Sequence, residues 1–270
     1  MSFENSNIGK ERDLHALRHT VIPHLLFARP TLIFIWILIP ISLLAVSSLT
    51  AFSISLMVLY QANDVSVSII NGLGVSVPGA SMPMMEPVVL LAGILCIRIV
   101  INRSMAIPIF LAGPKRTRVF FTITGYATGM CYLDVCLGSF ISELFSRAVM
   151  QQIIGMQTLP VPLQRSLLSS LIVALILSTH MIMLMAFCVI LDGIGKGIGI
   201  YAVVYYILPI IVSNIQALHP FHRFLPSIVS SEMLEINTNN NSFIGFILCI
   251  AYAAVASVAA VHAIENRDMK

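Results

Sequence analysis

The chain has 270 residues, of which 58% are hydrophobic and only 10% are charged, and its mean hydropathy is +0.94. Soluble domains average about 45–50% apolar and about 25% charged residues, so this composition excludes an ordinary soluble protein and indicates an integral membrane protein. The net charge of +3 gives no reason to invoke nucleic acid, and it fits loops that face anionic lipid.

The first thirty residues predict a cytoplasmic tail that contains an amphipathic helix at the inner membrane surface. Leu14, Leu17, Val21 and Leu25 recur at helical spacing, and most basic residues of this segment lie on other faces. An ordinary flexible tail is the alternative. The segment is too polar for a cleaved signal peptide, so we expect the first span to be retained.

Six apolar segments predict six transmembrane helices in one domain over residues 31–264, followed by a short tail at 265–270. The first segment, 31–60, contains Pro40 as the expected kink, and an external loop is predicted at 61–86. The loop 219–241 is too apolar to be fully solvated, so we expect short re-entrant helices before the last span. The other five spans are predicted at 87–101, 120–141, 167–191, 198–218 and 242–264.

The distribution of basic residues predicts the orientation of these spans. Of the 15 basic residues, 12 fall on one side of the membrane once the spans are threaded in order. Because Lys and Arg next to a span resist translocation, this side is expected to be the cytoplasm, with both termini in it. The twelve are Lys10, Arg12, Arg18, Arg29, Arg98, Arg103, Lys115, Arg116, Arg118, Lys196, Arg267 and Lys270, which leaves Arg147, Arg165 and Arg223 outside.

The segment between the second and third spans carries a family resemblance. Residues 102–120, NRSMAIPIFLAGPKRTRVF, have a basic start, an amphipathic middle, a Gly-Pro break and a basic cluster. With the six-span layout and the ending Glu-Asn-Arg-Asp at 265–268, this segment resembles the permease subunits of ABC-2-type ATP-binding-cassette exporters over nearly the whole chain. The positions that match the family pattern are Arg103, Pro114, Arg116, Arg267 and Asp268.

The chain also departs from that pattern. Ile101 or Asn102 stands where the family often has Glu, and Ile264 stands where its tail has an aromatic residue. A plain loop, whose charges only set the topology, is the alternative to a coupling segment.

The resemblance implies a transport subunit with no catalytic residue of its own. Two copies of an ABC ATPase subunit, holding ATP and Mg, would work beneath two permease chains that are identical or homologous. Cargo would be amphipathic or hydrophobic, such as a drug, an antimicrobial peptide or a lipid, and the location would be a bacterial plasma membrane. The implied coupling residues are Arg103, Met105, Ile107, Phe110, Pro114 and Arg116.

Motifs that would make the chain an enzyme are missing from the sequence. The glycine cluster at 193–199 has the wrong spacing for a phosphate-binding loop, so we expect it to form a turn with close helix packing. Neither HExxH nor GxSxG occurs. His219, His222 and Glu232 lack the spacing of a metal site, so none is expected. The five cysteines lie in apolar runs and are predicted to be core residues.

Asp134 and His180 are the ionisable residues deepest in the predicted spans. Such residues are functional candidates by default, so both are candidates for lining a substrate pathway. The alternative is structural, with Asp134 near the outer end of its span and a neutral His180 bridging two helices. A second functional hypothesis uses the same two residues in an intramembrane enzyme or an ion-coupled secondary carrier.

Overall fold

A computed structural model of the chain describes residues 77–101, 116–154, 163–234 and 241–268, together with a few isolated positions between 37 and 49. Three predictions therefore lie outside the described residues: the amphipathic helix before residue 30, most of the first span, and the coupling segment at 103–115. Arg116, the last implied coupling residue, is described and is the first residue of helix α8.

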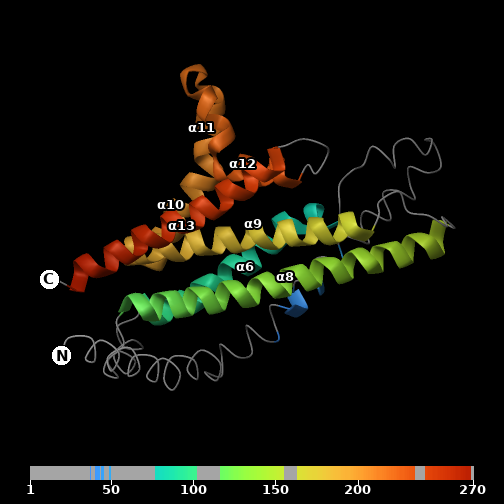
Figure 1. Cartoon of the computed structure of the whole chain (residues 1–270), viewed down its shortest axis with the longest axis horizontal. Coiled ribbons are helices and arrows are strands. Elements are labelled where there is room, and N and C mark those ends of the chain that lie inside the picture. The colour runs from blue at the N-terminus through green and yellow to red at the C-terminus, as the bar shows by residue number, and fades with distance from the viewer. Residues whose placement is uncertain are drawn as a thin grey trace, which may run out of the picture.

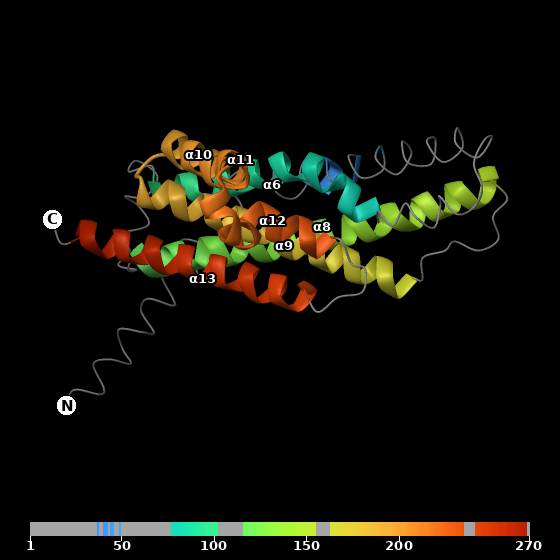
Figure 2. The same ribbon diagram turned by 90° about the horizontal axis from the view of Figure 1, so that it is seen from above.

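Every element in the described ranges is helical, and none is a strand. Figures 1 and 2 show a bundle of long helices with shorter helices on one side, where α11 rises away from the bundle. The long helices are α6 (Val77–Ile101), α8 (Arg116–Ile154), α9 (Leu163–Ile190) and α13 (Asn241–Asp268). The shorter ones are α10 (Ile194–Ala202), the π-helix η3 (Val203–Ile207), α11 (Leu208–Asn214), the 3-10 helix η4 (Gln216–Phe224) and α12 (Pro226–Leu234).

Five stretches of these helices are long and apolar enough to cross a membrane, which supports the predicted multi-pass, all-helical architecture. They are Ser81–Arg98, Thr117–Phe145, Leu167–Ile190, Ile194–Asn214 and Ile244–Asn266. The predicted first span, 31–60, would be the sixth and lies almost wholly outside the described residues. Helix α8 is longer than its predicted span, because 39 residues reach about 58 Å against a hydrocarbon core of about 30 Å.

The predicted boundary between the external loop and the second span is wrong. Helix α6 begins at Val77, ten residues before the predicted start at 87, and Glu86 lies inside it rather than in a loop. Pro83 and Pro87 also lie within α6. Proline is tolerated in membrane helices because neighbouring helices and side chains compensate for the lost backbone hydrogen bonds, so the two prolines did not mark a loop here.

Short helices precede the last span, in the segment where the sequence predicts them. Helices η4 and α12 occupy 216–234, and α12 packs on α13 and on α9. The sulfur atoms of Met233 on α12 and Cys249 on α13 lie 3.5 Å apart. The hydroxyl of Tyr252 on α13 donates a hydrogen bond to the carbonyl oxygen of Phe224 at the end of η4. This segment therefore returns to the bundle and packs on it.

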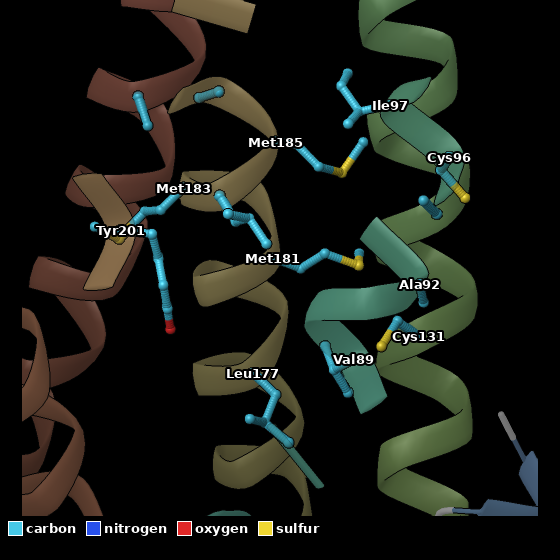
Figure 3. Close-up of a cluster of buried hydrophobic side chains, with 14 of the residues drawn as sticks. Val89, Ala92, Cys96, Ile97, Cys131, Leu177, Met181, Met183, Met185 and Tyr201 are labelled. Carbon is cyan, nitrogen blue, oxygen red and sulfur yellow. The ribbon is translucent and has the colours of Figure 1, made fainter. Parts of the chain in front are cut away.

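Helix α9 lies at the centre of the bundle, where α6, α8, α10 and α13 all pack against it. In its span, 78% of the most apolar stretch is buried inside the bundle, whereas the share is 17% in the α10–α11 span and 17% in the α13 span. Figure 3 shows Met181 and Met185 pointing from α9 toward α6, with Met183 pointing to the opposite side. Flexible, polarisable methionines fill irregular gaps of this kind.

The prediction that the cysteines are core residues is confirmed. All five are free thiols, of which Cys136 is half-buried and the other four are buried. They behave as small apolar residues, as their place in apolar helices predicts.

Basic residues gather at one end of the bundle, as the predicted threading requires. The end of α6, the start of α8, the turn from α9 to α10 and the end of α13 lie together in Figures 1 and 2. Arg98, Arg116, Arg118, Lys196 and Arg267 are at or near these helix ends. Arg147 lies near the end of α8 and Arg165 near the start of α9, and these two helix ends lie at the other end of the bundle, whereas Arg223 is in η4. Helix α8 therefore runs antiparallel to α6, α9 and α13, and the five cations at the shared helix ends lie together.

The glycine cluster has the structural role that we expected. The turn between α9 and α10 brings Gly197 against Cys188, and a Cβ atom on Gly197 would lie 2.7 Å from both the Cα and the backbone nitrogen of Cys188. Asp192 in the same turn adopts a left-handed conformation, with φ 52°. Asp is among the residues that tolerate this region. Glycine thus lets α10 leave α9 in close backbone contact.

Replacement of Gly197 by Ala should destabilise the protein, because the new methyl group meets backbone atoms that cannot rotate away. We expect a loss of about 1–3 kcal/mol, typical of overpacking, measured by unfolding of the purified protein in mixed micelles. Gly199→Ala is the matched control, since nothing lies within 4 Å of the position that its Cβ atom would occupy. Equal stability of the two variants would contradict the packing role.

Candidate functional site

His180 is the centre of a buried polar network in the middle of the bundle. It lies near the middle of the central helix α9 and is 1% exposed, with Leu177 and Met181 buried beside it on the same helix. Neighbouring Thr179 donates its hydroxyl proton to the carbonyl oxygen of Leu175 at 3.0 Å. Local back-bonding therefore satisfies Thr179, whereas His180 depends on partners from other helices.

The first partner of His180 is Glu86, which α6 carries. The Nδ1 atom of His180 lies 3.1 Å from Oε1 of Glu86, and the two side chains are 2% and 6% exposed. Ionisable groups this deep in an apolar bundle must be paired and hydrogen-bonded, because an isolated buried charge is costly. The pair joins residues 94 positions apart in sequence and ties α6 to α9.

Three tyrosines from the α10 and η3 segment surround this pair. The hydroxyl of Tyr201 donates to Oε1 of Glu86, and that of Tyr206 donates to Oε2 at 3.2 Å. The ring of Tyr205 packs edge-on against His180, with centroids 4.4 Å apart, and stacks on the ring of Tyr201. Both carboxylate oxygens of Glu86 therefore accept hydrogen bonds.

The π-helical turn explains how three tyrosines reach one site. Tyr201 and Tyr205 are four residues apart and share a face of an ordinary helix. Tyr206 is five residues from Tyr201 and would point elsewhere, but the η3 segment from Val203 to Ile207 has i→i+5 hydrogen bonds that widen the turn. Tyr206 is thus brought close enough to reach Glu86. Single π turns of this kind occur frequently at functional sites.

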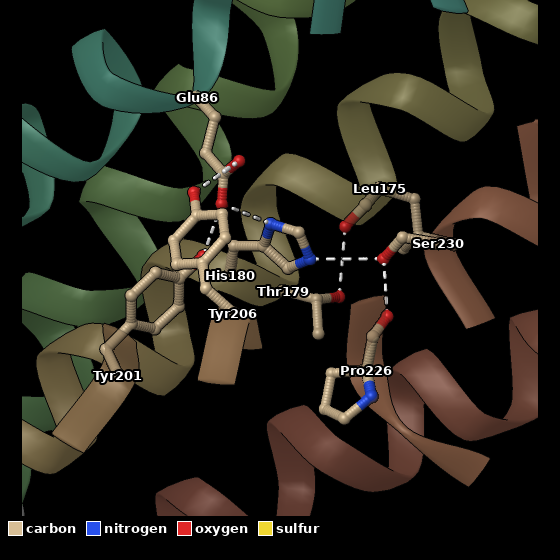
Figure 4. A network of polar contacts seen from close by, with 8 residues as sticks. All are labelled: Glu86, Leu175, Thr179, His180, Tyr201, Tyr206, Pro226 and Ser230. Atoms are coloured by element: carbon tan, nitrogen blue, oxygen red, sulfur yellow. Dashed lines mark hydrogen bonds and ion pairs between the residues drawn. The ribbon is translucent and has the colours of Figure 1, made fainter. Parts of the chain in front are cut away.

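Ser230 completes the network from helix α12. Its Oγ atom lies 3.1 Å from Nε2 of His180, and it donates to the carbonyl oxygen of Pro226 at 2.7 Å. Figure 4 shows His180 between Glu86 on one side and Ser230 on the other. Four parts of the chain, α6, α9, the α10–η3 segment and α12, therefore meet through one imidazole ring.

The order Ser230, His180, Glu86 resembles that of a serine hydrolase triad, but its setting does not suit a nucleophile. Ser230 is 2% exposed, and its hydroxyl proton points at Pro226. A cavity lies beside α12, and its lining includes Val229 and Glu232 but not Ser230. Mid-helix serines that bond the carbonyl four residues back are common structural features of helices. This geometry can hold and share a proton, and it does not present a hydroxyl to a substrate.

The structure separates the two residues that the sequence singled out. His180 is the hub of the network, whereas Asp134 is half-buried on α8, which contributes no side chain to the described contacts of His180 or Glu86. Sequence reasoning missed Glu86, because it placed this residue in a loop. It also missed Ser230 and the tyrosines, although polar residues at Tyr201, Tyr205 and Tyr206 within an apolar run were a usable signal.

A separate cavity of about 330 Å³ lies where η4, α12 and α13 meet. Its polar lining comes from His222, Arg223 and Glu232, and its apolar lining includes Val229 and Leu248. In the part of the chain that the structure describes, no three potential metal-binding side chains lie together. The side chain of His219 is outside that part.

Comparison with known proteins adds no relative to this picture. No protein-family model, curated protein or solved structure matches the chain. Functional inference therefore rests on the residues and their geometry.

Replacement of Glu86 by Ala should destabilise the fold strongly. The change leaves His180 and the hydroxyls of Tyr201 and Tyr206 without their acceptor in an apolar core. Breaking a buried pair costs about 3–5 kcal/mol, measurable as a fall in the free energy of unfolding in mixed micelles. Glu265→Ala on exposed α13 is the control and should change stability by less than about 0.5 kcal/mol. A small effect at Glu86 would contradict the central role of this carboxylate.

Proposed function

We propose that this chain is the permease subunit of an ABC-2-type exporter and forms half of a translocation pathway. The observation that carries the proposal is the pair of short helices η4 and α12, which returns between the last two spans and contacts the central helix α9. This arrangement, combined with the resemblance in the segment at 102–120 and in the tail at 265–268, supports a permease architecture.

The arrangement of helix ends supports a coupling role for residues 103–116. Helix α6 ends at Ile101 and α8 begins at Arg116, and both ends lie at the cation-rich end of the bundle. The connecting segment, with Arg103, Met105, Ile107, Phe110 and Pro114, is bounded by these two ends. A short rigid element there could pass a push from below to two long helices that both pack on α9.

The energy source in this proposal is a separate subunit. The glycine-rich stretch that comes nearest to a phosphate loop is the turn at 193–199, and Gly197 there is packed against Cys188. Its backbone is committed to helix packing. Two ATPase subunits with ATP and Mg would supply the work from the cation-rich end, which would then be cytoplasmic, as would both termini of the chain in the plasma membrane.

The weakly buried spans support a second permease chain and lipid as neighbours. The α10–α11 and α13 spans expose large apolar side chains, including Ile210, Phe246 and Val255. In a membrane such faces meet lipid or another transmembrane chain. A second copy or a homologue would complete the pathway for an amphipathic or hydrophobic cargo, such as a drug, an antimicrobial peptide or a lipid.

An ion-coupled carrier is the second candidate, and the Glu86–His180 pair is the observation that favours it. Paired carboxylate and imidazole groups inside a bundle are typical of proton relays. Asp134, the other ionisable residue that the sequence suggests for this role, is not part of the pair. A carrier would need no ATPase, whereas the permease would transport only with an ATPase subunit and ATP.

The permease proposal predicts a stable complex with an ATPase. Affinity purification of the tagged chain from its native membrane should recover a nucleotide-binding subunit in about equal amount, identified by mass spectrometry. Transport by reconstituted vesicles should require that subunit and ATP. If the purified chain alone moved a solute along an ion gradient, the carrier would replace the permease.

The coupling proposal makes a sharper prediction for residues 105–112. Exchange of these residues for a flexible Gly-Ser segment should leave membrane insertion intact and reduce export severely, because a flexible loop cannot transmit the ATPase movement. ATP hydrolysis and export should be measured in the same vesicles. A Gly-Ser exchange of equal length in residues 61–68, outside the coupling segment, is the control. Export at the normal rate in the first variant would show that the segment only sets topology.

A further inference from the structure

The hydrogen-bond partners of His180 indicate where the protons of this network lie. Ser230 has one hydroxyl proton, and at 2.7 Å this proton is directed to the carbonyl oxygen of Pro226. The 3.1 Å contact between Nε2 of His180 and Ser230 then requires a proton on Nε2. The 3.1 Å contact between Nδ1 and Oε1 of Glu86 requires a second proton, shared by these two atoms. Tyr201 and Tyr206 use their own hydroxyl protons on Glu86.

With these two protons the pair carries no net charge, as imidazolium with carboxylate or as neutral imidazole with carboxylic acid. Loss of one proton leaves a single negative charge in an apolar core. The remaining proton stays between Nδ1 and Oε1, so Nε2 becomes an acceptor. The hydroxyl of Ser230 must then turn from Pro226 to Nε2, and the Pro226 carbonyl loses this hydrogen bond. One proton lost by the pair thus changes the bonding of α12.

We infer that His180 and Glu86 form a proton-binding site whose occupancy sets how firmly helix α12 is held on the bundle. The bound state has a hydrogen bond donated by Nε2 to Ser230 and a second one within α12, from Ser230 to Pro226. The unbound state keeps only the contact between His180 and Ser230, in which the Ser230 hydroxyl now donates to Nε2. Because the site belongs to a coupled pair, one proton is bound by both residues together.

The other proton-bearing groups around the pair are hydroxyls that already hold their own protons, and a thiol on α13. The α10–η3 segment contributes Tyr201, Tyr205 and Tyr206, and α12 contributes Ser230, which lies beside the Tyr205 hydroxyl. Helix α13 carries Cys249 nearby, against Met233. From α8, Asp134 makes no bond to His180 or Glu86 within the described residues. A proton taken up here therefore resides on the pair.

The direction of the pH effect follows from this count. The pair gains its proton as pH falls, and the protonated pair makes the stronger attachment to α12. Attachment of α12 should therefore be stronger at low pH and weaken as pH rises and the pair loses its proton. A hydrogen bond that involves a charged partner is roughly twice as strong as a neutral one, so the expected change in opening of α12 is about tenfold.

Hydrogen–deuterium exchange of the full chain, purified without any partner, tests the inference. Protection factors of amides in 226–234, corrected for intrinsic exchange, should fall about tenfold in the wild-type chain between about pH 5 and about pH 9. Glu232→Gln, an exposed change on the same helix, should keep this dependence. His180→Gln should show protection that does not vary with pH.

Ser230→Ala keeps the test decisive if His180→Gln does not fold. This variant removes only the hydroxyl that carries the effect, so protection of α12 should again become independent of pH. Unchanged protection in the wild-type chain across the range, or equal pH dependence in Ser230→Ala, would overturn the inference. The measurement uses no ATPase and no cargo, so its outcome is separate from that of the permease proposal.

Discussion

The pairing of Glu86 with His180 is the interaction on which the arrangement of this bundle depends. Neither group could remain ionised alone in an apolar core, and the two helices that carry them, α6 and α9, pack against each other. The requirement for further partners brings in the tyrosines of the α10–η3 segment and Ser230 of α12. Four helical segments that are distant in sequence therefore have to converge on one ring.

This constraint also explains two irregular features. Helix α6 has to continue through Pro83 and Pro87, because Glu86 must enter the core from within a helix and not from a loop. The chain has to widen into a π turn at Val203–Ile207, because Tyr201 and Tyr206 both donate to the same carboxylate. Methionines at 85, 181 and 185 fill the uneven space left between these elements.

Features that depend on local composition were predictable from sequence. Hydropathy located four of the five described spans within a few residues, and basic residues predicted which helix ends lie together.

Partners distant in sequence were not predictable. Glu86 stands between two prolines, so it was assigned to a loop, and its partner is 94 positions away. Whether the hydroxyl of Tyr206 reaches Glu86 depends on a π turn, which no spacing rule reveals. Asp134 and His180 looked equivalent in sequence, because both are ionisable residues within apolar runs. They differ only in three dimensions, where His180 is buried beside Glu86 and Asp134 is half-buried.

A buried ionic network is a poor means of adding stability, since apolar residues of similar volume often stabilise a core as well or better. The network can instead specify one arrangement of the helices, and it can exist in a proton-bound and a proton-free state. Apolar packing would hold α12 with the same strength at every pH, whereas Ser230 bonds through a group whose proton count can change. In the proposed permease, α12 lies between the last two spans, next to the central helix that α6 and α8 also contact. A change in its attachment would act on α9, and a push on α6 and α8 would reach the same helix through their packing, so the two inputs would converge on α9.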